Sequence, residues 1–205
     1  MATLGIRRPD RRAWAGRRFR WSVVWHNHRV DFAREPDDIG AFLSSAGFPF
    51  AVIGGVALAA YGHPRMTLDL DLVSEAAAQD TIVAFMESRG FVTLHRSAGY
   101  SNHRHADRRH GRVDFMYVRG ETAARVFSGL RRLPGPGGRP IAVPRPEHLA
   151  AMKVQAMKDA PERTWQEMAD IGYLLKLEGV KRDEVRGYFE KADLLERWRE
   201  LERAR

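Results

Sequence analysis

Residues 65–73 read Arg-Met-Thr-Leu-Asp-Leu-Asp-Leu-Val, and apolar and polar side chains alternate along this stretch. Such alternation is typical of a β-strand, because successive side chains of a strand point to opposite faces of a sheet. Asp69 and Asp71 would then share one face, with Cα atoms about 6.5 to 7 Å apart. The other face would carry the apolar residues Met66, Leu68, Leu70 and Leu72. We therefore predict a strand with one face in the core and carboxylates on the other.

A glycine pair precedes this strand. Phe50–Ile53 is a short apolar run that predicts another strand, and it leads directly into Gly54-Gly55 and the alanine-rich stretch 56–61. The order is therefore strand, glycine turn and helix. Glycines at the start of a helix allow phosphate oxygens to approach backbone N–H groups. A tight bend would account for two glycines equally well, and both interpretations stay open at this point.

Periodicity and turn residues predict the other elements. We expect helices at 37–47, 75–89 and 122–131 and strands at 91–94 and 112–118, whereas the polar segment 96–112 follows no pattern. Pro144-Arg145-Pro146 introduces a part that reads as wholly helical, with helices near 147–160, 164–177 and 181–203. This order predicts an α+β fold that is followed by a C-terminal helical part.

Three regions follow from these elements. Residues 1–35 form a basic N-terminal extension with a strand-like stretch at Trp21–Phe32, residues 36–143 form the core, and residues 144–205 form the helical region. Seven arginines crowd the first twenty residues: Arg7, Arg8, Arg11, Arg12, Arg17, Arg18 and Arg20. Such an extension can bind RNA, or it can be a loose terminus without a role of its own.

The overall composition narrows the class of protein. The formal charge of +8 favours polyanionic partners, and the absence of cysteine excludes disulfides, thiolate metal sites and cysteine nucleophiles. No apolar run approaches the roughly 20 residues that a membrane helix needs, and the N-terminus lacks a secretory h-region. We therefore expect a cytoplasmic protein with no membrane association.

A third carboxylate has the same kind of placement as Asp69 and Asp71. The predicted strand 112–118 places Asp114 on the face opposite Val113 and Phe115, so Asp114 can join the first pair if the two strands are neighbours. Carboxylates together with substrate phosphates are the usual ligands of Mg²⁺, and Mn²⁺ is the alternative ion. Two such ions can activate a hydroxyl and neutralise a leaving pyrophosphate. A solvated strand face is the competing interpretation of the Asp-x-Asp pair.

The motif Val52-Ile53-Gly54-Gly55, thirteen further residues and Asp69-Leu70-Asp71-Leu72 resembles the signature of the DNA polymerase β-like nucleotidyltransferases. Residues 65–71, Pro146-Glu147-His148-Leu149 and Lys153 are similar to small bacterial members that include abortive-infection toxins of toxin–antitoxin systems. The resemblance implies a mixed sheet with flanking helices and a nucleoside triphosphate as substrate. It also implies metal ligation by Asp69, Asp71 and Asp114, and nucleotide contacts from Gly54, Gly55, Arg65, Thr67 and Lys153.

Lys153 can be assessed without the resemblance. On a helical wheel it falls within an apolar arc, together with Leu149, Met152, Ala156 and Met157. Its ammonium can reach the triphosphate, or its stem can extend along the edge of the core. For Arg163, Glu167 and Asp170, we favour an intramolecular ion pair.

The histidine-rich segment 102–110 suggests a zinc site, but we do not predict one. Arginines are interleaved with its histidines and would oppose cation binding, so a solvated loop or a basic loop beside the site fits better. The sequence contains no Gly-x-Ser-x-Gly motif, no Walker A motif and no dinucleotide fingerprint. Hydrolase chemistry through a serine nucleophile has no support.

The sequence therefore predicts transfer of a nucleotidyl group from a nucleoside triphosphate to an acceptor. RNA, for example the 3′ end of tRNA, is the acceptor that a toxin-like enzyme would use, with a cognate antitoxin as a further partner. A small-molecule acceptor of the aminoglycoside type predicts an acidic pocket beside the metal site, and protein modification by AMP is a third choice. From a different class, the chain can be a nucleic-acid-binding or regulatory module without turnover.

Overall fold

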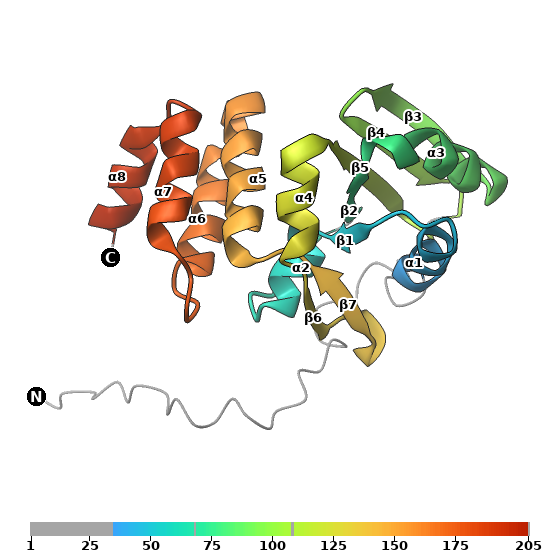
Figure 1. Cartoon of the computed structure of the whole chain (residues 1–205), viewed down its shortest axis with the longest axis horizontal. Coiled ribbons are helices and arrows are strands. Elements are labelled where there is room, and N and C mark those ends of the chain that lie inside the picture. Colours follow the sequence, from blue (N-terminus) through green and yellow to red (C-terminus); the bar gives the residue numbers. More distant parts are fainter. Residues whose placement is uncertain (1–34, 68, 108, 205) are drawn as a thin grey trace, which may run out of the picture.

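The computed structural model describes residues 35–67, 69–107 and 109–204, and a five-stranded sheet lies at its centre. The strand order is β1-β2-β5-β4-β3 (Figure 1). The bounds are β1 Phe50–Val52, β2 Asp69–Glu75, β3 Phe91–Ser97, β4 Tyr100–His105 and β5 Arg112–Val118. A separate two-stranded ribbon consists of β6 Arg131–Pro134 and β7 Pro140–Val143.

The sheet is mixed. β2 and β5 run parallel, and their register pairs Asp71 with Asp114 and Asp69 with Arg112. The pairs β1–β2, β4–β5 and β3–β4 are antiparallel, and a register irregularity lies between Thr93 and His95. An α+β fold with a mixed sheet and flanking helices is therefore confirmed.

Helices surround the sheet and continue beyond it. The helices of the sheet region are α1 Glu35–Ser45, α2 Gly54–Ala60, α3 Gln79–Ser88 and α4 Gly120–Ser128. The C-terminal helices are α5 Pro146–Asp159, α6 Thr164–Leu174, α7 Arg182–Lys191 and α8 Leu195–Arg203, and they line up at one end of the molecule in Figure 1. Short 3₁₀ turns occupy η3 Ala76–Ala78, η4 Pro136–Gly138 and η5 Pro161–Arg163. None of the helices in the described ranges is long and apolar enough to cross a membrane.

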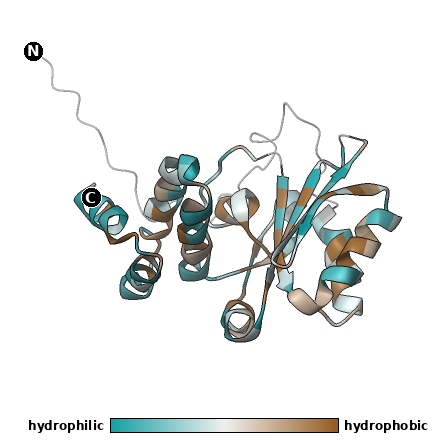
Figure 2. Ribbon diagram, turned by 90° about the horizontal axis from the view of Figure 1, so that it is seen from above, coloured by the Kyte–Doolittle hydropathy of each residue, from teal (hydrophilic) through white to brown (hydrophobic). Residues whose placement is uncertain are grey.

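The two faces of β2 have different surroundings. Leu70 and Leu72 are buried, and they belong to the core in which α1 and α3 pack. Phe42 of α1 stacks on Phe85 of α3 with ring centroids 3.8 Å apart. The helices are brown on the faces turned inward and teal on the outer faces (Figure 2). Asp69 and Asp71 project from the opposite face of the sheet, toward α5 and α6.

The structure corrects several sequence-based boundaries. β2 begins at Asp69 and not at residue 65, and Met66 is 71% exposed, so this methionine is not a core residue. The apolar alternation extended the predicted strand into a loop that has no pairing partner. The predicted helix 181–203 is two helices, α7 and α8, which are separated at Asp193, where φ is +61°.

Three strands, β4, β6 and β7, lie where the sequence predicted none. The polar segment 96–112 contains β4, which pairs with β3 on one side and β5 on the other. β6 and β7 flank the turn at Pro136, which the sequence indicated only as a connection. The predicted strand Trp21–Phe32, the arginines of the first twenty residues and Leu68 lie outside the described residues.

Candidate active site

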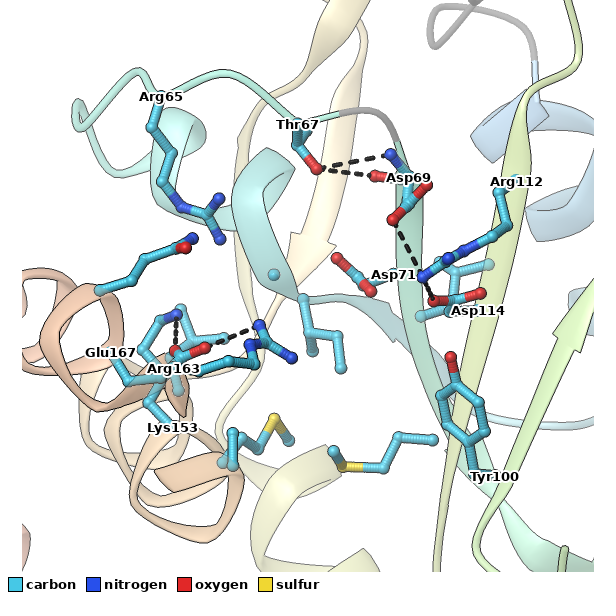
Figure 3. A pocket seen from close by; sticks show the side chains of 18 of the residues that line it. Arg65, Thr67, Asp69, Asp71, Tyr100, Arg112, Asp114, Lys153, Arg163 and Glu167 are labelled. Carbon is cyan, nitrogen blue, oxygen red and sulfur yellow. Dashed lines mark hydrogen bonds and ion pairs between the residues drawn. The ribbon is translucent and has the colours of Figure 1, made fainter. Parts of the chain in front are cut away.

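A cavity of about 620 Å³ lies between the carboxylate face of the sheet and the first turns of α6. Figure 3 shows Asp69, Asp71 and Asp114 on one side of it and Lys153, Arg163 and Glu167 on the other. Of the residues that the sequence singled out for metal or nucleotide binding, seven line this cavity: Gly54, Arg65, Thr67, Asp69, Asp71, Asp114 and Lys153. Gly55, the next residue along the chain, does not line it.

The three aspartates lie on two neighbouring strands. Asp71 and Asp114 are directly opposite one another in the parallel β2–β5 pair, and Asp69 is two residues earlier on the same face of β2. Burial raises the pKa of Asp71 to about 7, and the charges of Asp114 and Asp69 contribute to this increase. Burial also raises the pKa of Asp69, against the opposing charge of Arg112. The cluster is therefore electrostatically costly unless a cation accompanies it.

Arg112 supplies positive charge within this cluster. Its Nη2 donates a hydrogen bond to Asp114 Oδ2 at 2.7 Å and lies 3.0 Å from Asp69 Oδ2. The side chain of Arg112 is 42% exposed, so it can leave the carboxylates without opening the core. As the side chains are placed, no three His, Asp or Glu groups of the described ranges converge closely enough to hold a metal ion. A cation that binds both Asp69 and Asp114 would have to displace the Arg112 guanidinium.

Asp114 is held in place by residues of β4. The side-chain amide of Asn102 donates to Asp114 Oδ1 at 2.7 Å, and the hydroxyl of Tyr100 forms a hydrogen bond with the same carboxylate. Burial and this hydrogen bond raise the pKa of Tyr100, so the phenol stays protonated as a donor. The sequence did not single out Tyr100, Asn102 or Arg112. Only the pairing of β4 with β5 brings the first two beside Asp114.

The glycine pair allows β2 to pass close to the start of α2. Gly54 has φ +62°, and a Cβ at this position would overlap the Asp71 carboxylate. A Cβ at Gly55 would lie 2.7 Å from Cβ of Thr67. The hydroxyl of Thr67 donates to the backbone carbonyl of Asp69 at 3.1 Å and so fixes the start of the strand. Both glycines are therefore required by the approach of the strand that carries the acids.

Lys153 lies at the centre of an ion-pair network in the helical wall. It is buried, and its Nζ donates to Glu167 Oε2 at 2.7 Å and to Asp170 Oδ2 at 2.5 Å. Arg163 Nη2 lies 2.7 Å from Glu167 Oε1, and Arg65 Nε lies 3.3 Å from Asp170 Oδ2. The two carboxylates therefore hold three cations along one side of the cavity. The predicted ion pair of Arg163 is present, and its partner is Glu167.

The donor set of the carboxylate cluster suits a hard divalent cation. All three acids offer oxygen. The described lining of the cavity contains no histidine, and its sulfur atoms are the thioethers of Met66, Met116 and Met152, which are poor ligands for a hard cation. Burial and then the charges of Asp114 and Asp69 raise the pKa of Asp71, and a bound cation would favour its ionised form. The residues present therefore fit Mg²⁺ or Mn²⁺, with Asp69, Asp71 and Asp114 as the candidate ligands.

The histidines of segment 102–110 have structural contacts of their own. His103 is buried and forms hydrogen bonds with the hydroxyl groups of Ser101 and Thr93 at 2.8 and 3.2 Å. His105 and His110 contact each other and the ring of Phe91. Within the described part of the chain these side chains form no metal cluster.

The fold just described is that of the nucleotidyltransferases. One solved structure that shares it is the antibiotic-resistance factor ANT(2″)-Ia, with a TM-score of 0.58 and 17% identity over 82% of this chain and 93% of that one. A second is the lincosamide antibiotic adenylyltransferase LnuA, in its lincomycin-bound form, with a TM-score of 0.51 and 12% identity over 73% of this chain and 99% of that one.

A third is an antigenic nucleotidyltransferase-like protein from Paracoccidioides brasiliensis, with a TM-score of 0.51 and 16% identity over 82% and 88% of the two chains. Comparison with protein-family models found no match, and neither did comparison with curated proteins. The similarity to these solved structures thus establishes the fold. The activity and the substrate have to be argued from the site itself.

Proposed function

We propose that this protein is a metal-dependent nucleotidyltransferase that transfers a nucleotidyl group from a nucleoside triphosphate to an acceptor hydroxyl. The observation that carries this proposal is the direct juxtaposition of Asp71 and Asp114 on parallel strands, with Asp69 on the same face of the same cavity. A solvated strand face is a poor alternative, because Asp114 is buried, Asp71 is half-buried with a raised pKa, and their charges need compensation.

Each residue of the cluster has a distinct part in this proposal. Asp69, Asp71 and Asp114 would hold Mg²⁺ or Mn²⁺, which supplies charge neutralisation for the triphosphate when bound. The acceptor oxygen forms a bond to the α-phosphorus, the bond from that phosphorus to the pyrophosphate oxygen breaks, and the hydroxyl proton passes to the Asp114 carboxylate. Asn102 and Tyr100 orient that carboxylate through their hydrogen bonds.

The helical wall provides the contacts for the triphosphate. Arg65 and Arg163 line the cavity and are anchored by buried carboxylates, so their guanidinium groups are ordered before phosphate arrives. Lys153 uses two of its three N–H donors on Glu167 and Asp170, and the third remains for a phosphate oxygen. Thr67 and the backbone of Gly54 would also contact the nucleotide. Gly55 acts indirectly, because its missing side chain allows Thr67 to lie close to the start of α2.

RNA is the acceptor class that the charges favour. The lining of the cavity is balanced in charge, with Arg65, Arg112, Lys153 and Arg163 against Asp69, Asp71, Asp114 and Glu167. The aspartates are assigned to the metal ion and three of the cations to the triphosphate, so the preference for RNA comes from the charge of the rest of the chain. Residues 1–34 also contain nine arginines against two acids, so nearly all of the +8 excess belongs to this segment. A chain with such a basic segment suits a polyanionic acceptor, such as the 3′ end of tRNA.

The second candidate is transfer to an antibiotic. ANT(2″)-Ia, which has been solved with adenylyl-2″-tobramycin, and the lincosamide adenylyltransferase LnuA share the fold of this chain. The toxin-like hypothesis adds a cytoplasmic location and a cognate antitoxin. It rests on the sequence motifs at residues 65–71 and 146–153. A binding module without turnover is a third alternative.

A transfer assay separates these candidates. The purified protein is incubated with each α-labelled nucleoside triphosphate, Mg²⁺ and either total RNA, an aminoglycoside, lincomycin or no acceptor. We expect label in RNA, and none with the double variant Asp69→Asn, Asp71→Asn. Asp159→Asn, an exposed aspartate of α5, is the matched control and should transfer normally. Label in an antibiotic alone would select the second candidate, and an active double variant would refute the assignment of the site.

A further inference from the structure

A second cavity lies directly behind the active-site wall. Its volume is about 460 Å³, and residues of α6 and α8 together with His63 line it. α6 separates the two cavities, since Gln166 and Glu167 line the active site whereas Met168 and Ala169 line the second cavity. The two cavities therefore share α6 as a wall.

Aromatic side chains mark its rim. Trp165, in the first turn of α6, is 76% exposed and lines the second cavity. Within the same cavity, the rings of His63 and Tyr173 are stacked, with centroids 4.3 Å apart and an interplanar angle of 18°. An indole of this exposure is unusual for a packing residue, because a tryptophan normally buries most of its large apolar surface. Its exposed surface can serve as a platform for another planar group.

Cations accompany these aromatic side chains. The guanidinium of Arg197 lies 6.0 Å from the Trp165 ring centroid, and Lys176 and Arg182 contribute to the lining. Glu200 of the lining forms an ion pair with Arg197 at 2.9 Å, and Arg182 forms one with Glu202. Exposed aromatic rings among basic side chains are the arrangement with which proteins bind unpaired nucleotides, because bases stack on the rings and phosphates pair with the cations.

We propose that this second cavity, centred on Trp165, is a subsite for an unpaired nucleobase of a single-stranded nucleic acid. The inference rests on the proposed RNA acceptor and extends it: the 3′ end enters the active site while an upstream base stacks on Trp165. A small antibiotic acceptor would fill the active-site cavity and leave this surface without a role.

Binding of RNA can be measured without any turnover. The full chain is titrated into a fluorescein-labelled single-stranded decaribonucleotide in EDTA, so that neither metal nor nucleotide is required. Trp165→Ala should weaken binding by roughly 5- to 150-fold, the range of a lost base–aromatic stack. Trp165→Phe should retain most of the affinity. Leu94→Ala is the matched control, since Leu94 is also an exposed apolar residue (55%) but lies on the edge strand β3.

The salt dependence distinguishes stacking from a general loss of charge. Trp165→Ala should lower affinity and leave the slope of log affinity against log salt unchanged, because phosphate contacts determine that slope. Equal affinities of Trp165→Ala and Leu94→Ala, or no binding of the oligonucleotide by the wild type, would overturn the subsite whether or not the enzyme transfers nucleotides. Loss of self-association with unchanged RNA binding would identify the surface as a protein interface and would also overturn the proposal.

Discussion

Replacing Asp71 by Asn should stabilise the metal-free protein at alkaline pH. Asp71 has a pKa of about 7 in the folded protein, against an ordinary value of 3.8, because burial of its carboxyl group and the charges of Asp114 and Asp69 raise it. A carboxyl group whose pKa is raised by folding favours the folded state when protonated and opposes it when ionised. The Asp71 carboxyl group therefore destabilises the folded protein increasingly as the pH rises from about 4 to about 7, and its effect is constant above that range. An amide at this position does not ionise and escapes the penalty.

The magnitude follows from the difference between the two pKa values. One pKa unit corresponds to about 1.4 kcal/mol, so the ionised carboxylate costs the folded state about 4 kcal/mol at pH 8. At pH 5 the same reasoning gives less than half of this cost. For a chain of this size, about 4 kcal/mol corresponds to an increase in Tm of roughly 8 to 16 °C. Chemical and thermal unfolding in EDTA at pH 5 and pH 8 would measure it.

Addition of Mg²⁺ should reverse the order of stability. The ion compensates the charge of the wild-type cluster and has less to bind in the variant, so the wild type should gain stability and Asp71→Asn should gain little. Asp159→Asn is the control, because this exposed carboxylate has no buried charge to relieve. If Asp71→Asn were no more stable than the wild type at pH 8, the electrostatic account of the cluster would be wrong.

Three further substitutions test the surroundings of the cluster. Arg112→Ala removes the guanidinium that occupies the carboxylates, so half-maximal stabilisation by Mg²⁺ in a thermal-shift titration should move to lower Mg²⁺ concentration; a move to higher concentration would contradict this. Gly54→Ala should lower the free energy of unfolding, measured by denaturant titration, by more than 1 kcal/mol, since a Cβ overlaps Asp71 and φ is +62°. The same substitution should abolish stabilisation by Mg²⁺. Lys153→Ala should cost about 3 to 5 kcal/mol in urea unfolding, because Glu167 and Asp170 lose a buried partner. Lys158 is an exposed lysine of the same helix, so Lys158→Ala should leave the free energy of unfolding unchanged. An equal loss in both variants would exclude a specific role of the Lys153 network.

The acids of the candidate site could be predicted because strand alternation is a local property. Asp69, Asp71 and Asp114 each lie in a segment whose pattern gives the face of the side chain, and the parallel pairing of β2 with β5 then brings them together. Met66 shows the limit of the same pattern, since alternation continues beyond the point where the strand loses its partner. Pairing is a tertiary property that a single sequence does not contain.

The supporting residues could not be found in this way. Tyr100 and Asn102 lie on β4, whose polar sequence has no apolar face that would identify a strand. Arg112 was visible only as the first residue of a predicted strand, and its role depends on the register that places it opposite Asp69. Lys153 was recognisable as a lysine in an apolar arc, but its partners on α6 follow from how two helices pack. Side chains that act through contacts between elements need the fold before they can be assigned.

Binding of Mn²⁺ tests the central claim most directly, because free and bound ions are distinguished by electron paramagnetic resonance. The titration is performed with a non-hydrolysable nucleoside triphosphate analogue, with the wild type, Asp71→Asn and Asp159→Asn in parallel. If the proposed site is right, the wild type and Asp159→Asn should bind Mn²⁺ saturably, and the analogue should strengthen this binding. Asp71→Asn should lose it. Equal binding by all three proteins would contradict a metal site built from the acids of β2 and β5.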